Sequence, residues 1–185
     1  MNGRKGEEMK KGLFILGVIV ILLATCMDTH AETKYRYTTQ KVKLSKDLTV
    51  KHNTKVLVIK QGKKYAKVEY KGEQYLVRKK YLCKWKSPKL YTRKQFKRRG
   101  RIRWRGWSWT WYTQRILPGR GLKIPGRHVD KQGFVCDKDG YIVLASSIGY
   151  RKCKKILPTP FGKYGKVYDT NGTWNYGWRD VYTNW

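Results

Sequence analysis

Short runs of alternating apolar and polar residues dominate residues 38–83. Three of them, KVLVI, YAKVEY and QYLVR, are rich in β-branched and aromatic residues, and they are separated by Gln61-Gly62 and Lys71-Gly72. Glycine-containing dipeptides between such runs are hairpin signals, and no stretch here has the 3.6-residue period of a helix. The pattern predicts a compact barrel of about five strands over residues 38–83.

A second alternating pattern runs through residues 107–185. In WSWTWYT the residues Trp107, Trp109 and Trp111 occupy one parity and other side chains the second, which is the period of a β-strand. Five further runs, each bounded by turn residues, follow: GFVC, GYIVLAS, KCKKIL, GKVYDT and RDVYTNW. We expect about six strands, no obvious helix and a small barrel that is closed or nearly closed. The predicted fold class is therefore all-β, with two small barrels.

The segment between the two patterns, residues 84–106, is strongly basic and contains no acid. Its interleaved arginines and tryptophans are typical of segments that bind nucleic acid or membranes. Pro88 and Gly100 interrupt it, and a compact pattern follows at once. We interpret the segment as a solvated linker between two domains that adds affinity for anionic polymers.

Residues 1–31 have the layout of an export signal. Basic residues precede an apolar run, LFILGVIVILL, and small residues precede a cleavage position after Ala31. The run is short for a membrane span of about 20 residues. A cleaved signal peptide is therefore favoured over a retained anchor through residues 13–27, and either reading predicts an exported protein of the cell wall or the extracellular space.

The charge of the chain is extreme. It carries 43 Lys and Arg against 12 Asp and Glu, a formal net charge of +31. Such a field attracts polyanions. Because export disfavours nucleic acid, we expect peptidoglycan and anionic wall polymers as partners, contact with the membrane only through the N-terminal segment, and a monomer.

Cysteine and histidine residues are few beyond the N-terminal segment. There is no CxxC motif, and His52 and His128 stand apart, so we expect no metal site and no cofactor. In an oxidising compartment Cys136 and Cys153 could form a disulfide. Free thiols are the open alternative, because three cysteines, Cys83 among them, cannot all pair within one chain.

The run KVLVIKQGKKYAKVEYKGEQYLVRKKYL resembles a bacterial SH3 domain. It departs from the family pattern at Gln74, where glycine is common. The resemblance implies a wall-binding module over residues 38–83. In it Tyr65 and Tyr75, with Tyr70 and Tyr81, could line a groove for peptides of peptidoglycan; the alternative is that these rings pack the barrel.

Four runs of the C-terminal pattern occur in the order found in 3D-type domains: TWYTQRILPGRGLKIPGRHV, GFVCDKDGYIVLASS, TPFGKYGKVYDT and RDVYTNW. The chain here resembles this family, whose double-psi β-barrels occur in murein lytic transglycosylases and in the RlpA-like group. Two of its three signature aspartates correspond to Asp169 and Asp180. The first is missing, because Ala145 or Ser146 stands in its place.

The resemblance implies that Asp180 is a catalytic acid and base and that Asp169 supports it. A single carboxyl can protonate a leaving oxygen and then accept a proton, provided that burial or a neighbouring carboxylate raises its pKa. From the residues alone, Asp169 also fits a turn cap, whereas Asp180 lies in a strand-like run where Asp is disfavoured. Four nearby aromatic residues could contact the sugar rings: Trp174, Tyr176, Trp178 and Tyr182.

The remaining polar residues of this region have structural explanations. A hairpin turn accounts for Asp137 and Asp139 in the sequence DKDG, and we expect Asp130 and His128 to support loops.

Two functions follow from these expectations. The first is an exported wall protein that binds peptidoglycan and cleaves its glycan as a lytic transglycosylase does. The alternative is a wall-binding protein whose 3D-type domain has lost catalysis.

Overall fold

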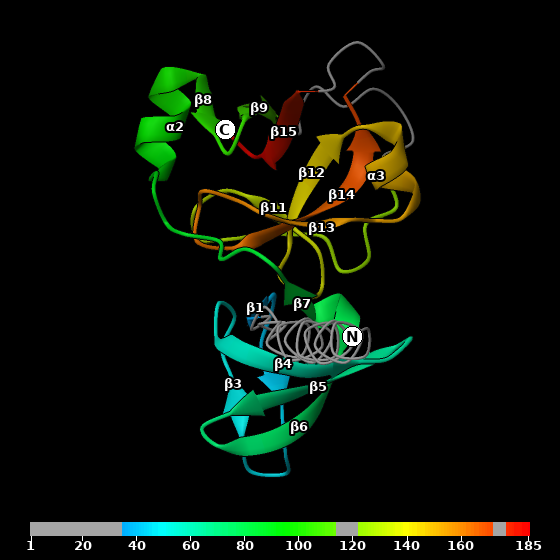
Figure 1. Cartoon of the computed structure of the whole chain (residues 1–185). Coiled ribbons are helices and arrows are strands. Elements are labelled where there is room, and N and C mark those ends of the chain that lie inside the picture. Colours follow the sequence, from blue (N-terminus) through cyan, green and yellow to red (C-terminus); the bar gives the residue numbers. More distant parts are fainter. Residues whose placement is uncertain (1–34, 114–121, 172–176) are drawn as a thin grey trace, which may run out of the picture. The chain divides into compact units, whose positions relative to one another are not determined.

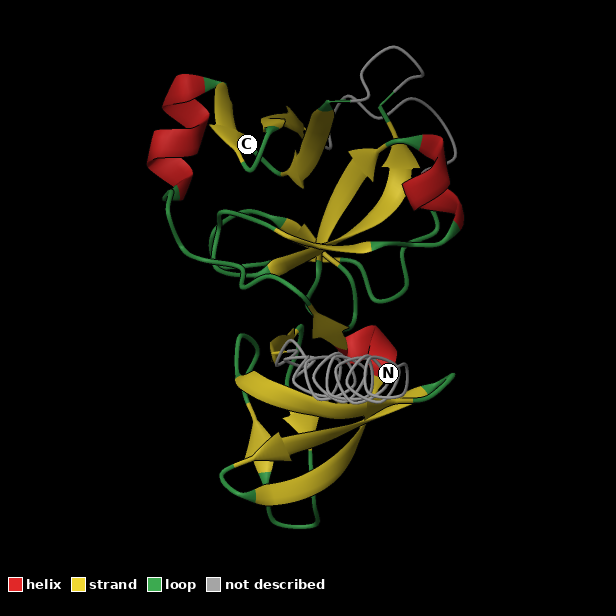
Figure 2. Ribbon diagram, viewed as in Figure 1, coloured by secondary structure: helices red, strands yellow, loops and turns green. Residues whose placement is uncertain are grey.

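The computed structural model describes residues 35–113, 122–171 and 177–185 (Figure 1). Strands predominate in this part of the chain, and its helices are short (Figure 2). The all-β class is therefore confirmed. None of the helices in these three ranges is long and apolar enough to cross a membrane. The predicted export segment lies outside the described residues.

The first region is an antiparallel sheet with the strand order β6-β5-β4-β1-β7 and a separate β2–β3 pair. Its elements are β1 (Tyr35–Thr38), β2 (Val42–Lys43), β3 (Thr49–Val50), β4 (Lys55–Gln61), β5 (Tyr65–Tyr70), β6 (Glu73–Arg78), the 3-10 turn η1 (Lys79–Tyr81) and β7 (Leu82–Cys83). Lys71 and Gly72 join β5 to β6 with φ of 55° and 81°, the left-handed geometry of a two-residue hairpin loop. The expected hairpin at Lys71-Gly72 is confirmed.

The core of this region consists of alternate inward side chains. Val56, Val58, Val68 and Val77 are buried on one face of β4, β5 and β6, as a half-buried strand requires. Leu76, between them in sequence, is 70% exposed on the opposite face.

Residues 84–106 differ from the linker that we expected. They form α2 (Arg93–Arg99) and β8 (Arg101–Trp104), and β8 pairs with β9 (Trp107–Thr113). Phe96 is fully buried in the same core as Trp109 and Phe161. The segment is therefore part of the second region: its apolar side chains enter the core while its many cations stay outside.

Helix α2 is short but has a complete N-terminal cap. The Thr92 side chain accepts a hydrogen bond from the backbone N–H of Gln95, and the Gln95 side chain accepts one from the Thr92 backbone N–H, which together form a capping box. Gly100 ends the helix with a φ of 68°. Sequence periodicity missed it because seven residues give only two turns.

The second region is a curled half-barrel sheet with the order β10-β11-β12-β15-β9-β8, to which β14 and β13 are added beside β12. Its further elements are β10 (His128–Val129), β11 (Val135–Cys136), β12 (Ile142–Ser146), α3 (Ile148–Lys152), β13 (Ile156–Pro158), β14 (Tyr164–Thr170) and β15 (Trp178–Thr183). All six expected runs contain a strand, whereas β10 and the helix α3 were not expected. Helix α2 lies beside β8 and α3 beside β14 (Figure 1).

The central strands of this sheet bury both faces. Trp109, Leu144 and Val181 belong to the core on one face, and Ala145 and Tyr182 belong to the core on the other. The expected period-two alternation of β9 is thus confirmed, with its tryptophans on the first face. A strand buried on both sides holds its side chains in fixed positions, and the candidate site lies on two such strands.

The structure does not form the disulfide that was one of our two expectations. Cys83, Cys136 and Cys153 are all free. Cys136 points into the core from β11, whereas Cys153 is exposed at the end of α3. Their different burial explains why they do not pair.

Candidate functional site

The two expected acids lie in one row across the sheet. Asp169 of β14 and Asp180 of β15 are both register partners of Ala145, on opposite sides of β12, and Asp180 is next paired with Thr110 of β9. Neighbouring strands are about 4.8 Å apart, so the two aspartates are about 10 Å apart along the row. The structure therefore brings both acids to one site, with the small Ala145 between them.

A β-bulge brings Asp169 into this row. The pairing of β12 with β14 passes from Leu144–Val167 directly to Ala145–Asp169, so Tyr168 is an extra residue. An extra residue changes which face the following side chains point to. As a result Asp169 lies on the same face as Ala145, and without the bulge it would lie on the other.

Asp180 is half-buried and has one hydrogen-bond partner within the described residues. Thr110 donates its hydroxyl hydrogen to Oδ1 of Asp180. Burial raises the pKa of the Asp180 carboxyl above its ordinary value, and the hydrogen bond from Thr110 opposes this in part. The net shift favours the neutral carboxylic acid, which is the form that can donate a proton.

Asp169 accepts two hydrogen bonds, one more than Asp180 has among the described residues. Its Oδ1 accepts a hydrogen bond of 2.8 Å from the backbone N–H of Thr170, and its Oδ2 accepts one of 2.6 Å from the hydroxyl of Tyr182. Burial, followed by the bond to Asp169, raises the pKa of the Tyr182 hydroxyl, so Tyr182 remains a donor. Asp169 therefore combines a bond from the next backbone N–H of β14 with a contact across the site, and the expected turn cap stays a prediction.

Arg179, next to Asp180 in sequence, lies on the opposite face of β15. Its guanidinium carbon is 3.8 Å from the centroid of the Trp107 ring and 5.2 Å from that of Trp109. Adjacent residues of a strand point to opposite faces. Arg179 therefore does not pair with Asp180.

The four aromatic residues expected to contact sugars differ in their positions. Trp174 and Tyr176 lie outside the described residues. Trp178 is partly exposed, and its ring lies 4.0 Å from the guanidinium carbon of Arg101. Tyr182 is only 3% exposed, so its ring packs in the core and its hydroxyl, rather than its face, serves the site.

Of the four tyrosines of the first region, Tyr65 and Tyr81 line one cavity of about 320 Å³. Tyr75 packs against the core together with Tyr70 and Tyr81. Tyr65 points to the other face of the sheet, is 44% exposed and lines a basic cavity of about 470 Å³. Tyr65 thus remains a candidate contact for a ligand, while Tyr75 has the packing role that was our alternative.

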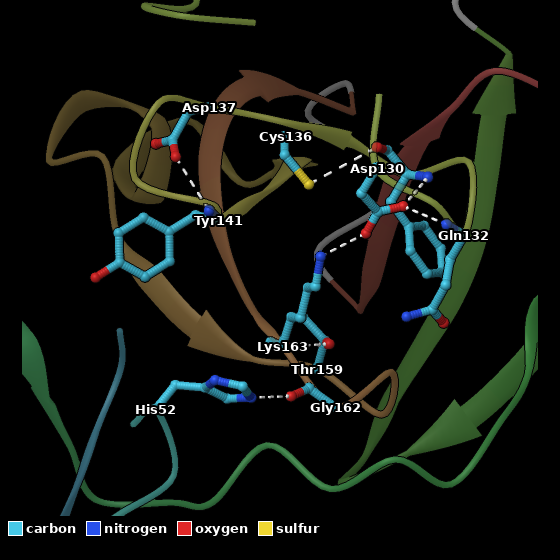
Figure 3. Close-up of polar contacts among 10 residues, drawn as sticks. His52, Asp130, Gln132, Cys136, Asp137, Tyr141, Thr159, Gly162 and Lys163 are labelled. Carbon is cyan, nitrogen blue, oxygen red and sulfur yellow. Dashed lines mark hydrogen bonds and ion pairs between the residues drawn. The ribbon is translucent and has the colours of Figure 1, made fainter. Parts of the chain in front are cut away.

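Two further acids of the second region have structural roles, as expected (Figure 3). Asp137 is fully buried, and its Oδ1 accepts hydrogen bonds from the backbone N–H groups of Asp139 and Tyr141. Asp130 caps a second turn through Gln132, and its Oδ2 lies 2.6 Å from Nζ of Lys163. Both carboxylates hold loops in place.

His128 also has the loop role that we expected. Its Nδ1 lies 3.0 Å from the carbonyl oxygen of Gly126, and its side chain is exposed. His128 is thus a loop contact on the surface of the second region.

Sequence analysis missed two members of the site, Thr110 and Tyr182 as a hydrogen-bond donor. Thr110 lies in a run remarkable only for its tryptophans, and its contact with Asp180 depends on the parallel pairing of β9 with β15. The alternation of β9 did predict that Thr110 lies on the face opposite the tryptophans, but not that it contacts Asp180.

Comparisons of this chain with models of protein families, with curated proteins and with solved structures found no match.

Proposed function

We propose that this chain is an exported protein that binds peptidoglycan and cleaves its glycan strands in the manner of a lytic transglycosylase. The single observation that carries the proposal is Asp180, a half-buried carboxyl whose pKa is raised by burial and which lies two strands from Asp169, with Ala145 of β12 between them. A general acid must be protonated near neutral pH, and burial shifts the pKa of Asp180 in that direction.

In the proposed reaction, Asp180 donates its proton to the glycosidic oxygen as the bond between that oxygen and the anomeric carbon breaks. The 6-hydroxyl oxygen of the same sugar then bonds to the anomeric carbon, and its proton passes to the Asp180 carboxylate. The products are a shortened glycan and an anhydro sugar end, and Asp180 is neutral again. Water takes no part, so a second carboxylate to activate it is not required.

The fold supports the resemblances on which this proposal builds. The pairs β12–β14 and β15–β9 are parallel within a sheet whose other pairs are antiparallel. Parallel neighbours need crossing connections rather than hairpins, which is consistent with a double-psi β-barrel. The antiparallel sheet of residues 35–83 is consistent with a bacterial SH3 domain that would hold the chain on the wall.

A specific observation favours the alternative, a wall-binding protein without catalysis. Ala145, one of the two residues with Ser146 at which the family resemblance would place its first aspartate, lies between Asp169 and Asp180 and is 4% exposed. A carboxyl there would raise the pKa of Asp180 further. Its absence leaves burial as the main cause of the shift at Asp180.

The test is digestion of purified peptidoglycan by the full chain. The structure rules out the shorter fragment 107–185 for this purpose, because it would remove the buried Phe96 from the core. We expect release of muropeptides with anhydro ends, detected by mass spectrometry, and loss of that release in Asp180→Asn. The matched control is Asp139→Asn, which makes the same chemical change at an exposed turn.

The outcomes separate the two functions. Release by the wild type and by Asp139→Asn, but not by Asp180→Asn, supports the enzyme. If all three proteins sediment with the wall and none of them releases anhydro muropeptides, the enzymatic function is rejected in favour of the wall-binding one.

A further inference from the structure

A basic cavity of about 500 Å³ lies on the face of the second region opposite to Asp180. Its described lining residues include no acid and four cations, which are Lys84, Arg105, Lys155 and Arg179. Its walls include the rings of Trp85, Trp107 and Tyr150. The cavity thus combines a concentrated positive charge with flat apolar surfaces.

Arg179 is the unusual member of this set, because it is only 6% exposed. Neither of the two salt bridges among the described residues involves it, and its Nε has no hydrogen-bond partner there. Burial lowers the pKa of its guanidinium to about 10, so it is still charged at neutral pH. A buried charge without a counter-ion is costly. The faces of the Trp107 and Trp109 rings offset part of that cost, but no acid among the cavity's described lining residues neutralises the charge, which suits the binding of an anion.

A second buried polar group lies next to Arg179. The pairing of β12 with β15 runs Leu144–Val181 and Ala145–Asp180, and its continuation by one residue sets Ser146 opposite Arg179. Ser146 is fully buried, and its hydroxyl has no hydrogen-bond partner within the described residues. Ser146 is not among the residues that line the cavity, so the unsatisfied Nε of Arg179, which does line it, is the group that indicates a ligand site.

The remaining residues fit the entrance of such a site. The guanidinium carbon of Arg105 is 3.8 Å from the centroid of the Trp85 ring. That of Arg179 is 3.8 Å from the centroid of the Trp107 ring, which itself lies 6.4 Å from the Tyr150 ring. Both arginines are therefore held against aromatic rings, which fixes the direction of their N–H groups. Fixed guanidinium groups match the oxygens of a phosphate in pairs.

We propose that this cavity is a binding site for a phosphate group, with Arg179 as its innermost ligand and Lys84, Arg105 and Lys155 around it. Four positive charges suit a phosphate, which carries up to two negative charges, better than a single carboxylate. The site goes beyond the proposed glycan cleavage and is independent of it. Both a free phosphate and the phosphodiester of an anionic polymer have this chemistry.

The test is the thermal unfolding midpoint of the full chain, measured with inorganic phosphate, with diethyl phosphate, and with sodium chloride at matched ionic strength. A ligand that binds only the folded state raises the midpoint with the logarithm of its concentration above Kd. We expect a rise with phosphate that chloride does not reproduce. A rise with diethyl phosphate as well assigns the site to phosphodiesters, and its absence assigns it to free phosphate or a monoester.

The deciding variant is Arg179→Met, which keeps an apolar side chain against Trp107. Without phosphate it should be at least as stable as the wild type, because an unpaired buried cation is removed, and it should lose the response to phosphate. The matched control, Arg98→Met, removes the same charge from the exposed face of α2 and should keep the response.

A further variant covers the case in which Arg179→Met does not fold. Arg179→Lys keeps the charge but not the paired N–H groups, and it should weaken phosphate binding at least tenfold, measured by tryptophan fluorescence. Equal responses of the wild type and either Arg179 variant, or of phosphate and chloride, would overturn the proposal. Loss of the phosphate response with unchanged glycan cleavage, and the reverse in Asp180→Asn, would separate this site from the proposed function.

Discussion

Asp137 and Asp180 occupy the same small β-fold and have opposite environments. Asp137 is fully buried, and its two oxygens receive hydrogen bonds from two backbone N–H groups and, at 2.8 Å, from the hydroxyl of Tyr168. Nζ of Lys166 lies 3.5 Å away. Asp180 is half-buried, and Thr110 is its hydrogen-bond partner in the described part of the chain.

The difference shows what burial means for a carboxylate. When donors surround a buried carboxylate, its charge is compensated and the group stabilises the fold. When donors are few, burial instead favours the neutral acid and leaves a group able to exchange a proton. The number of donors, rather than burial alone, therefore separates a structural aspartate from a candidate acid.

The largest effect that this comparison predicts is that of Asp137→Ala. The change removes the acceptor of two backbone N–H groups and of the Tyr168 hydroxyl, and buried donors without partners cost about 1–3 kcal/mol each. We expect the free energy of unfolding to fall by about 3 kcal/mol or more. Urea denaturation followed by tryptophan fluorescence measures it.

The control for this prediction is Asp139→Ala in the same turn. Asp139 is exposed, and such substitutions usually change stability by no more than about 0.5 kcal/mol. Equal losses in the two variants would mean that the turn, and not the buried carboxylate, matters.

Much of this fold could be predicted from the sequence. The alternation of Trp107, Trp109 and Trp111, the hairpin at Lys71-Gly72 and the DKDG turn at Asp137 depend on neighbouring residues, and all three are present in the structure. Local patterns report local structure because strand alternation and turn geometry are set within a few residues.

The candidate site could be predicted only in part. Sequence reasoning placed Asp180 in a strand, but it could not supply the bulge at Tyr168 or the parallel pairing that brings Thr110 to Asp180. Those depend on contacts between segments far apart in the chain. The burial of Phe96 likewise depends on contacts with distant segments, so the many cations of residues 84–106 predicted a solvated linker instead.

An intermediate effect is expected for the bond between Asp169 and Tyr182. Asp169 resembles Asp137 in accepting a backbone N–H and a tyrosine hydroxyl, but it is only partly buried. A hydrogen bond to a charged group contributes about 1.5 kcal/mol or somewhat more. We expect a double-mutant cycle of Asp169→Asn and Tyr182→Phe, measured by urea denaturation, to give a coupling of about that size.

The cycle has an internal control in Thr170, which bonds to Asp169 through its backbone. Thr170→Ala keeps that N–H, so its cycle with Asp169→Asn should give little coupling. If the Asp169–Tyr182 coupling is no larger than this reference, Asp169 is not held by the tyrosine and its position in the site is set by the backbone alone.

The smallest effect, and the sharpest for the comparison, is the pH dependence of stability at Asp180. A carboxyl whose pKa is raised on folding binds more protons in the native state, so the free energy of unfolding falls as the pH rises from the unfolded value of 3.8 towards the raised one. Asp180→Asn lacks this loss. The variant should therefore gain stability relative to the wild type as the pH rises through this window. Above the window the difference stays constant, because the native wild type has by then lost its extra proton.

Solvent reaches the Asp180 carboxyl, which keeps this gain in stability below the effects expected for Asp137→Ala and for the Asp169–Tyr182 bond. Urea denaturation at a series of pH values measures the difference. A variant that loses stability with rising pH would show that Asp180 is held as a carboxylate, and would remove the physical basis for its role as an acid.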